Sequence, residues 1–93
     1  MKNLRINKVI LTIEVKVKKD VKITNAGNPV RTIIGAYRSY NSEGNFKENR
    51  LKLVFKNNQL PYVEDFNIND YVYIEGYFDE NKNIRVNHFQ KLG

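Results

Sequence analysis

Arginine, lysine and tyrosine side chains recur together in three segments of this sequence, where they could bind a single-stranded nucleic acid. Cations follow the phosphates of such a strand and flat rings stack on its bases, each stacked base contributing about 1–3 kcal/mol. Neither contact reads a base sequence, so this chemistry predicts binding without strong sequence preference. The candidate contacts are Arg31, Tyr37, Arg38 and Tyr40 in the first segment, Lys47, Arg50 and Lys52 in the second, and Tyr73 and Tyr77 in the third.

Composition narrows the classes of site that the chain can build. Its 93 residues carry 16 Lys and Arg against 10 Asp and Glu, a formal net charge of +6. This excess favours a polyanionic partner, although many ordinary proteins share it. The chain has no cysteine, which excludes disulfides and cysteine-based zinc sites. His88, the single histidine, has no partner in sequence, so we expect it at the surface or a sheet edge, and we expect no cofactor.

Apolar residues between Lys8 and Lys18 fall at every second position, which is the period of a half-buried β-strand. Further strands are predicted over 30–40, 46–56, 71–78 and 84–92, with a short run at 21–23. Turn-forming residues at 25–29, 41–45 and 79–83 separate them, so that hairpins are expected. The residues expected on the core face of the first strand are Val9, Leu11, Ile13, Val15 and Val17.

A different period follows the third long strand. Between Asn57 and Asn69, Leu60, Val63 and Phe66 recur at three-residue spacing, enough for one or two helical turns. Five strands with a short helix between the third and fourth match the OB-fold, a small all-β Greek-key barrel. An SH3-like barrel is the competing fold, but its commoner form lacks a helix there. The length predicts a single domain over residues 1–93.

Three segments carry a resemblance to a known family. They are Asn7-Lys8-Val9-Ile10-Leu11-Thr12, then Thr24-Asn25-Ala26-Gly27-Asn28-Pro29-Val30, and finally Tyr71-Val72-Tyr73-Ile74-Glu75-Gly76. In order and spacing they resemble the bacterial single-stranded DNA-binding proteins of the OB-fold class. The resemblance covers roughly residues 5–92. It implies an OB-fold whose second and third strands form the ligand face.

Several positions depart from the pattern of that family. Ile13 stands where the family has glycine, so we expect the first strand to curve less, or to curve by a bulge. The tryptophans that the family uses as stacking platforms are absent. Tyr40 falls within a residue of one platform, about Asn49 corresponds to a lost second one, and Phe55 matches a family aromatic. The resemblance thus adds Phe55 to the candidate contacts.

The chain is similar to a minimal form of that family. It has no acidic C-terminal tip, the element with which the family recruits repair and replication enzymes, and its last hairpin is shortened to Asp79–Asn83. Such a form is expected from a plasmid, phage or other mobile element, or among the short primosomal OB-fold proteins.

Strand parity predicts where the aromatic rings point. Phe66, Phe78 and Phe89 are expected in the core, because a small barrel without tryptophan needs large apolar side chains. Tyr71, Tyr73 and Tyr77 share the opposite parity on their strand and should form an outward row.

Phe55 and a lysine cluster each leave two interpretations open. Leu51, Leu53 and Phe55 share one parity, so a core position for the leucines would bury Phe55 as well unless a bulge intervenes. In that case Arg50 and Lys52 are the groove residues. The lysines of the first loop could be a phosphate track or a solvated charged face. They are Lys16, Lys18, Lys19 and Lys22.

These observations predict a non-catalytic protein that binds single-stranded DNA in replication or recombination. RNA is an alternative ligand, because stacking does not distinguish the sugars. No converging set of acidic, nucleophilic or metal-ligating residues indicates an enzyme. The rival function is an OB-fold subunit that docks on a polymerase, primase or helicase through its tyrosines. We also expect a homodimer paired through 6–13. The charged N-terminal residues 1–5 argue against a signal peptide or membrane span, which predicts a cytoplasmic protein.

Overall fold

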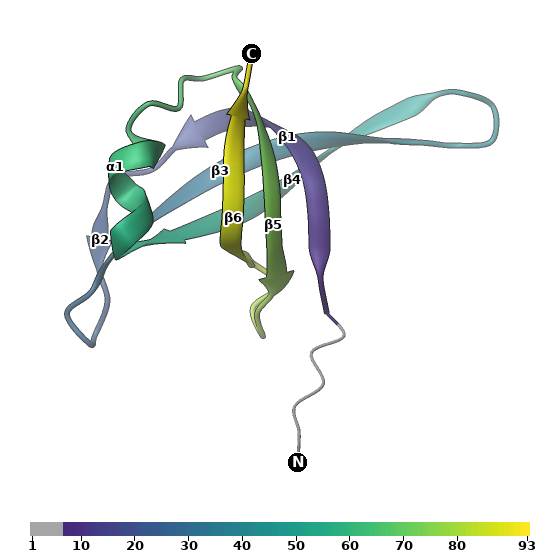
Figure 1. Ribbon diagram of the computed structural model, residues 1–93. Coiled ribbons are helices and arrows are strands. Elements are labelled where there is room, and N and C mark those ends of the chain that lie inside the picture. Colours follow the sequence, from purple (N-terminus) through teal and green to yellow (C-terminus); the bar gives the residue numbers. More distant parts are fainter. Residues whose placement is uncertain (1–6) are drawn as a thin grey trace.

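The first strand, β1 (Val9–Lys18), bends so that its two halves pair with different strands in the computed structural model, which describes residues 7–93. Its first half, up to Glu14, runs antiparallel to β5 (Tyr71–Phe78), and its second half runs antiparallel to β3 (Pro29–Tyr40). β4 (Phe46–Lys56) pairs with β3 and with β6 (Ile84–Leu92), which returns to β5. The strands therefore close into a barrel (Figure 1).

Three short elements complete the fold and confirm the predicted order. β2 (Lys22–Ile23), the short run of the sequence pattern, pairs with the start of β3. After β4, the chain forms a 3₁₀ turn, η1 (Asn57–Gln59), and then α1 (Leu60–Val63). This is the expected helix between the third and fourth long strands, and the strand bounds agree with the alternation to within one residue. Within residues 7–93 no helix is long and apolar enough to cross a membrane.

The core is formed by the inward faces of the five long strands and by the segment after β4. Phe55 lies at its centre with no exposed surface, and its ring meets those of Phe66 and Phe89 edge-on at centroid distances of 5.8 and 5.4 Å. The core prediction is confirmed for Phe66, while Phe89 is only partly buried against the core. The fully buried side chains also include Ile13, Ile33, Leu53, Val63, Ile74 and Ile84.

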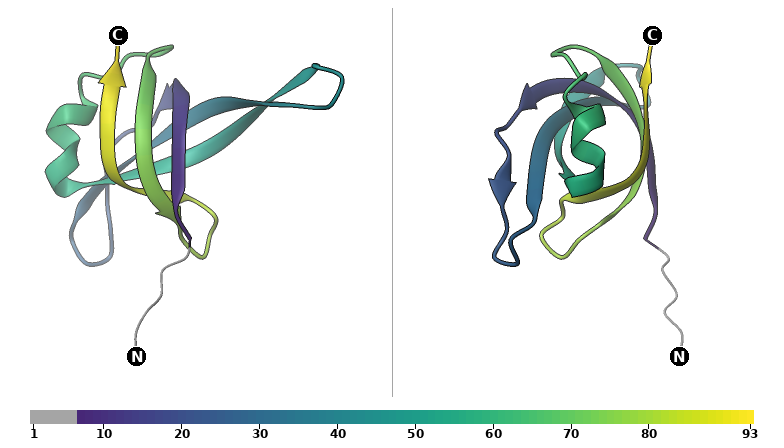
Figure 2. Two further views of the ribbon diagram at one scale, coloured as in Figure 1. Left: turned by 45° about the vertical axis from the view of Figure 1, so that its right-hand side comes forward. Right: turned by 60° about the vertical axis from the view of Figure 1, so that its left-hand side comes forward.

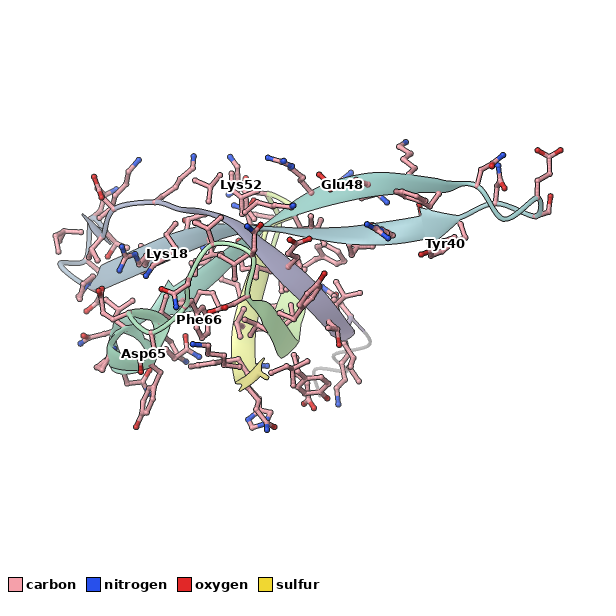
Figure 3. The ribbon with its side chains drawn as sticks, turned by 90° about the horizontal axis from the view of Figure 1, so that it is seen from above. Lys18, Tyr40, Glu48, Lys52, Asp65 and Phe66 are labelled. Atoms are coloured by element: carbon pink, nitrogen blue, oxygen red, sulfur yellow. The ribbon has the colours of Figure 1, made fainter. Side chains whose placement is uncertain are left out.

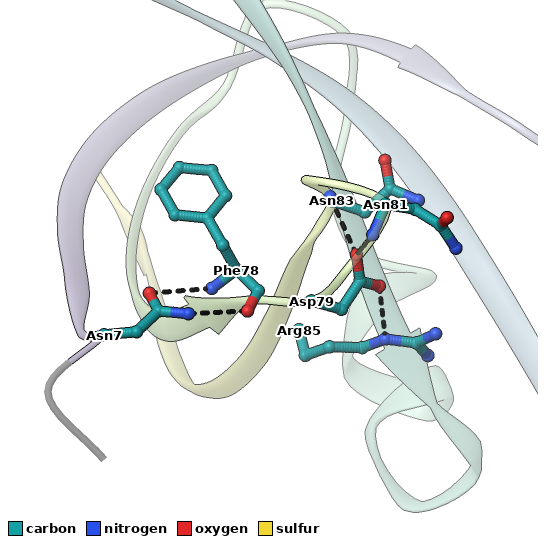
Figure 4. Close-up of polar contacts among 6 residues, drawn as sticks. All are labelled: Asn7, Phe78, Asp79, Asn81, Asn83 and Arg85. Atoms are coloured by element: carbon teal, nitrogen blue, oxygen red, sulfur yellow. Dashed lines mark hydrogen bonds and ion pairs between the residues drawn. The ribbon is translucent and has the colours of Figure 1, made fainter. Parts of the chain in front are cut away.

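Phe78 was expected in the core, and that prediction is wrong. Its side chain is 38% exposed because it ends β5 at the rim of the barrel. The side chain of Asn7 holds the backbone there: Asn7 Nδ2 donates to the Phe78 carbonyl at 2.6 Å, and the Phe78 N–H donates to Asn7 Oδ1 at 3.1 Å (Figure 4).

β1 curves by a bulge, the second of the two predicted possibilities. The register with β3 shifts between Val15 and Val17, so Val17 turns outward and is 38% exposed; its expected place on the core face is wrong. Ile13 is fully buried because Gly35 on β3 leaves space for it. A Cβ at Gly35 would lie 2.4 Å from Ile13 Cδ1. The space for the Ile13 side chain is thus provided by the glycine on the neighbouring strand.

The β3–β4 hairpin extends far beyond the barrel. β1 pairs with β3 only as far as Ala36, and β6 pairs with β4 only at Leu53 and Val54, so the outer arms pair with each other alone. The loop between the arms is held by Asn41, whose Oδ1 accepts the N–H groups of Glu43 and Asn45 at 2.9 and 3.1 Å. Figure 1 and the left view of Figure 2 show this projecting arm.

Candidate nucleic-acid interface

The outer face of the β3–β4 ladder follows from its register. Partners in an antiparallel ladder project to the same side, and Ile33 and Leu53 face the core. The next pair, Ile34 and Lys52, therefore faces outward. This outer face continues to the tip of the hairpin, about 20 Å away for six residues at roughly 3.3 Å each. It carries Arg38 and Tyr40 from β3 and Phe46, Arg50 and Lys52 from β4. Figure 3 labels Tyr40, Glu48 and Lys52 along the two arms of the hairpin.

Two exposed rings and a cation meet at the tip of this face. Tyr40 and Phe46 are 64% and 56% exposed, and their centroids lie 6.0 Å apart. The Arg38 guanidinium carbon lies 4.4 Å from the centre of the Phe46 ring, a cation–π arrangement. Rings held in this way offer faces on which bases can stack, with a positive charge beside them.

A hollow lined by lysines lies at the other end of the face. It measures about 170 Å³, and Lys52 from β4 meets Lys19 and Lys22 from the first loop there, with Thr32 of β3 beside them. Asp20 also lines the hollow, so the positive charge is partly offset. Three ammonium groups around one depression can neutralise phosphates. Half of the predicted lysine cluster thus joins the outer face.

Between the ring pair and the lysine hollow, carboxylates partly neutralise the positive charge of the outer face. Glu48 lies opposite Arg38 in the register and forms a 3.2 Å ion pair with Arg50. Nearby, Thr12, Glu14, Arg38 and Tyr71 help to line a cleft of about 220 Å³ where the hairpin leaves the barrel. This middle region therefore favours bases over phosphates.

Solved structures with the same architecture match almost the whole chain. The protein priB from Ralstonia solanacearum superposes with a TM-score of 0.79 at 13% identity, over 96% of this chain and 100% of that chain. The SSB domain of a Synechococcus sp. protein gives 0.79 at 18% identity, over 96% and 99%. A Plasmodium falciparum SSB complex with ssDNA gives 0.78 at 20% identity, over 100% of both chains. The fold is the OB-fold. No family model and no curated protein matches the sequence.

Phe55 cannot belong to the ligand face of this OB-fold. The β3–β4 ladder has no bulge, so Phe55 keeps the inward parity of Leu53 and is fully buried. Its predicted role as a stacking platform is wrong. The resemblance to the family predicted a ligand contact for Phe55, whereas strand parity predicted a core position, and the core position is confirmed.

Arg31 is also turned away from the outer face. It has the inward parity of Ile33, at the end of the barrel near α1, and its side chain is only 14% exposed. Its guanidinium donates to the Lys19 carbonyl at 2.8 Å and pairs with the Glu64 carboxylate. Arg31 therefore joins the first loop to the end of α1, and its predicted DNA contact is not compatible with this placement.

Tyr37 and Lys47 have the register of the opposite face of the hairpin, although Tyr37 also borders the cleft that Arg38 lines. They share parity with Ser39 and Asn49, whose side chains are hydrogen bonded at 2.9 Å between Asn49 Nδ2 and Ser39 Oγ. A strand bound across Arg38 and Tyr40 would not meet Lys47. The hairpin therefore separates residues that were predicted to act together.

Tyr73 and Tyr77 point outward as predicted, but from β5, which β6 separates from β4. Both are half-buried. The Tyr73 hydroxyl donates to the Glu75 carboxylate, and this hydrogen bond raises the pKa of Tyr73. His88 lies beside Tyr73 at a ring distance of 6.3 Å, on the surface as expected. These residues lie on the outer surface of β5 and β6, away from the tip of the hairpin, and His88 also lines a hollow beside α1.

The remaining lysines of the predicted cluster have structural partners. Lys16 forms a 3.3 Å ion pair with Glu14, and Lys18 Nζ donates to the Glu64 carbonyl at 3.2 Å. The register of β1 shifts at Lys16, and Lys18 lies beyond this bulge, which explains why a cluster that is close in sequence divides in space.

Phe46 is the residue that sequence reasoning missed. The five-residue loop between Tyr40 and Phe46 places the two rings opposite each other across the hairpin. The length of the loop and the alternation of both arms could have predicted that Phe46 lies opposite Tyr40 on the outer face. Within residues 7–93, no group of three His, Asp or Glu side chains could hold a metal ion.

Proposed function

We propose that this protein binds single-stranded DNA across the outer face of β3 and β4, without catalysis, as a cytoplasmic protein of replication or recombination in a mobile element. The observation that carries the proposal is the exposed ring pair of Tyr40 and Phe46 beside Arg38, on the same face as the lysine hollow. The SSB structure from Plasmodium falciparum, which has the same fold, holds ssDNA and supports this choice of ligand. RNA is the alternative ligand because stacking tolerates either sugar.

Fluorescence anisotropy of a labelled dT oligonucleotide tests the proposal. The protein is titrated at low and moderate salt, with unlabelled duplex of equal length as competitor. We expect affinity that falls with salt and a preference for the single strand. No binding at low salt, or equal competition by duplex, would contradict the proposal.

Substitutions on the outer face of β3 and β4 test whether DNA binds there. The double substitution Tyr40→Ala and Phe46→Ala should weaken binding at least tenfold, because each lost stacked base costs about 1–3 kcal/mol. Tyr40→Phe keeps the ring and should bind like the wild type. Lys52→Ala should weaken binding, whereas Lys47→Ala removes the same charge from the opposite face of the same strand and should not.

A second function is favoured by the outer surface of β1 and β5. Tyr71 and Ile10 are each 53% exposed on neighbouring strands, and aromatic residues are enriched at protein interfaces. In this alternative, the protein docks on a polymerase, primase or helicase and binds DNA weakly or not at all. Calorimetric titration against such an enzyme would show salt-insensitive binding that Ile10→Ala weakens and Tyr40→Ala does not.

We propose a homodimer paired along the first half of β1. Of the predicted segment, Ile6 lies outside the described residues. Val9–Ile13 pair with β5 on one side and are not paired with β3 on the other. A strand edge of this kind can accept a second strand. Light scattering after size exclusion should give about 22 kDa, twice the 11.0 kDa of the chain, and a monomer mass would contradict the dimer.

A further inference from the structure

Two further hollows continue the lysine hollow around the end of the barrel. The first, of about 480 Å³, shares Val30 with the lysine hollow and lies between the β2–β3 turn and the start of η1. The second, of about 380 Å³, shares Lys56 and Asn58 with the first and lies between α1 and β6. The three depressions therefore follow one another, and the elements that border them lie together at one end of the barrel (Figure 2).

This end of the barrel offers the same chemistry as the hairpin face. Lys56 lines both further hollows, and Arg85 adds a second cation, partly neutralised by a 2.9 Å ion pair with Asp79. Tyr62 on α1 is 64% exposed, as much as Tyr40. Its ring meets that of Phe89 at a steep angle, with centroids 6.3 Å apart, which leaves ring surface for a ligand.

A buried glutamine anchors the backbone that carries these side chains. Gln59 is 7% exposed; its Oε1 accepts the Lys56 N–H, and its Nε2 donates to the Val86 carbonyl, both at 2.8 Å. Gln59 therefore fastens η1 to β6 between Lys56 and Tyr62. Because this backbone is already ordered, a ligand that binds over it causes a smaller loss of backbone freedom than one that must order the segment.

We propose that a single strand longer than the β3–β4 face continues over η1 to α1, where Lys56 neutralises a phosphate and Tyr62 stacks on a base. This inference rests on the proposed function and adds a second subsite to it. Short oligonucleotides would occupy the hairpin face alone, and longer ones both subsites. The affinity should therefore rise in two stages with length.

The test is a series of dT oligonucleotides from about 4 to about 16 nucleotides, the range of site sizes for one OB-fold. Binding of the full chain is measured by anisotropy for the wild type, Tyr62→Ala and Lys56→Gln. Both variants should bind short oligonucleotides like the wild type. On the longest, Tyr62→Ala should lose about fivefold or more, as expected for one stacked base. Lys56→Gln should also bind the longest more weakly, with a salt slope smaller in magnitude by about 0.7, as expected for one lost phosphate contact. Circular dichroism confirms that each variant is folded.

Two control variants separate the chemistry from unspecific effects. Tyr62→Phe keeps the ring and should retain the full affinity for long oligonucleotides. Lys47→Gln removes an exposed charge outside the three hollows, on the opposite face of the hairpin, and should leave the length dependence unchanged. A loss in Tyr62→Phe equal to that in Tyr62→Ala would overturn the stacking role.

The outcomes distinguish this subsite from the proposed function. If Tyr62→Ala and Lys56→Gln match the wild type at every length while the Tyr40 and Phe46 double variant is weakened, the second subsite is wrong and the hairpin face stands. If the wild type itself binds no oligonucleotide at low salt, both proposals are wrong.

Discussion

Glu48 is the residue that most opposes the proposed binding of a polyanion. Its carboxylate lies among the cations of the outer face, opposite Arg38 and paired with Arg50. Both members of that pair are about half exposed, with side-chain exposures of 54% and 43%, so the pair itself adds little to stability. Because Glu48 lies on the proposed ligand face, we expect its negative charge to weaken the binding of DNA instead.

Glu48→Gln should therefore strengthen binding to single-stranded DNA by about two- to fivefold, the range expected for one exposed charge interaction. The substitution removes a negative charge near the phosphates and releases Arg50 to contact them. Anisotropy with a dT oligonucleotide at low salt measures the gain. Glu43→Gln, in the loop beyond the ring pair, is the matched control, and an equal gain in both variants would show that only net charge matters.

The three five-residue loops between paired strands, residues 24–28, 41–45 and 79–83, are built alike. In each, a Thr, Asn or Asp side chain accepts a backbone N–H, and the fourth residue has a positive φ. Glycine occupies that fourth place twice, as Gly27 and Gly44 at φ 86° and 87°, but Lys82 occupies it at φ 65°. A side chain there is strained.

Lys82→Gly should raise the free energy of unfolding by up to about 1 kcal/mol. The relief of a left-handed conformation is worth roughly 1–2 kcal/mol, and the greater freedom of glycine in the unfolded chain offsets part of it. Chemical denaturation measures the difference. Gly44→Lys makes the reverse exchange at the same turn position and should lower stability; a destabilised Lys82→Gly variant would contradict this account.

Asp79 makes the same turn sensitive to acid. Partial burial raises its pKa, but the N–H groups of Asn83 and Asn81 and the Arg85 guanidinium outweigh this, so the pKa lies below its ordinary value of 3.8 (Figure 4). A lowered pKa in the folded state stabilises the fold above the ordinary value, and this stability is lost as pH falls through the folded value. Between pH 7 and 3, Asp79→Asn should therefore lose less unfolding free energy than the wild type in urea titrations. Equal losses would contradict this.

Strand alternation predicted the elements well because most long strands keep one face in the core and the other in solvent. It failed at Val17, where a bulge exchanges the faces, and at Phe78, where the barrel ends. The candidate site was harder to predict, since parity alone does not tell which strands are neighbours. Tyr73 has the predicted orientation but lies on β5, away from β4.

The distribution of charge over the whole molecule gives the most general test. Seven cations line the proposed path from the hairpin face to α1: Lys19, Lys22, Arg38, Arg50, Lys52, Lys56 and Arg85. If each neutralises one phosphate, the logarithm of the binding constant should fall against the logarithm of salt with a slope of about −4.9, or 0.7 per phosphate for single strands. Combining Arg50→Ala with Lys52→Ala should reduce this magnitude by about 1.4. A wild-type slope near zero would instead favour the protein-docking function, because contacts through the tyrosines of β5 release no counterions.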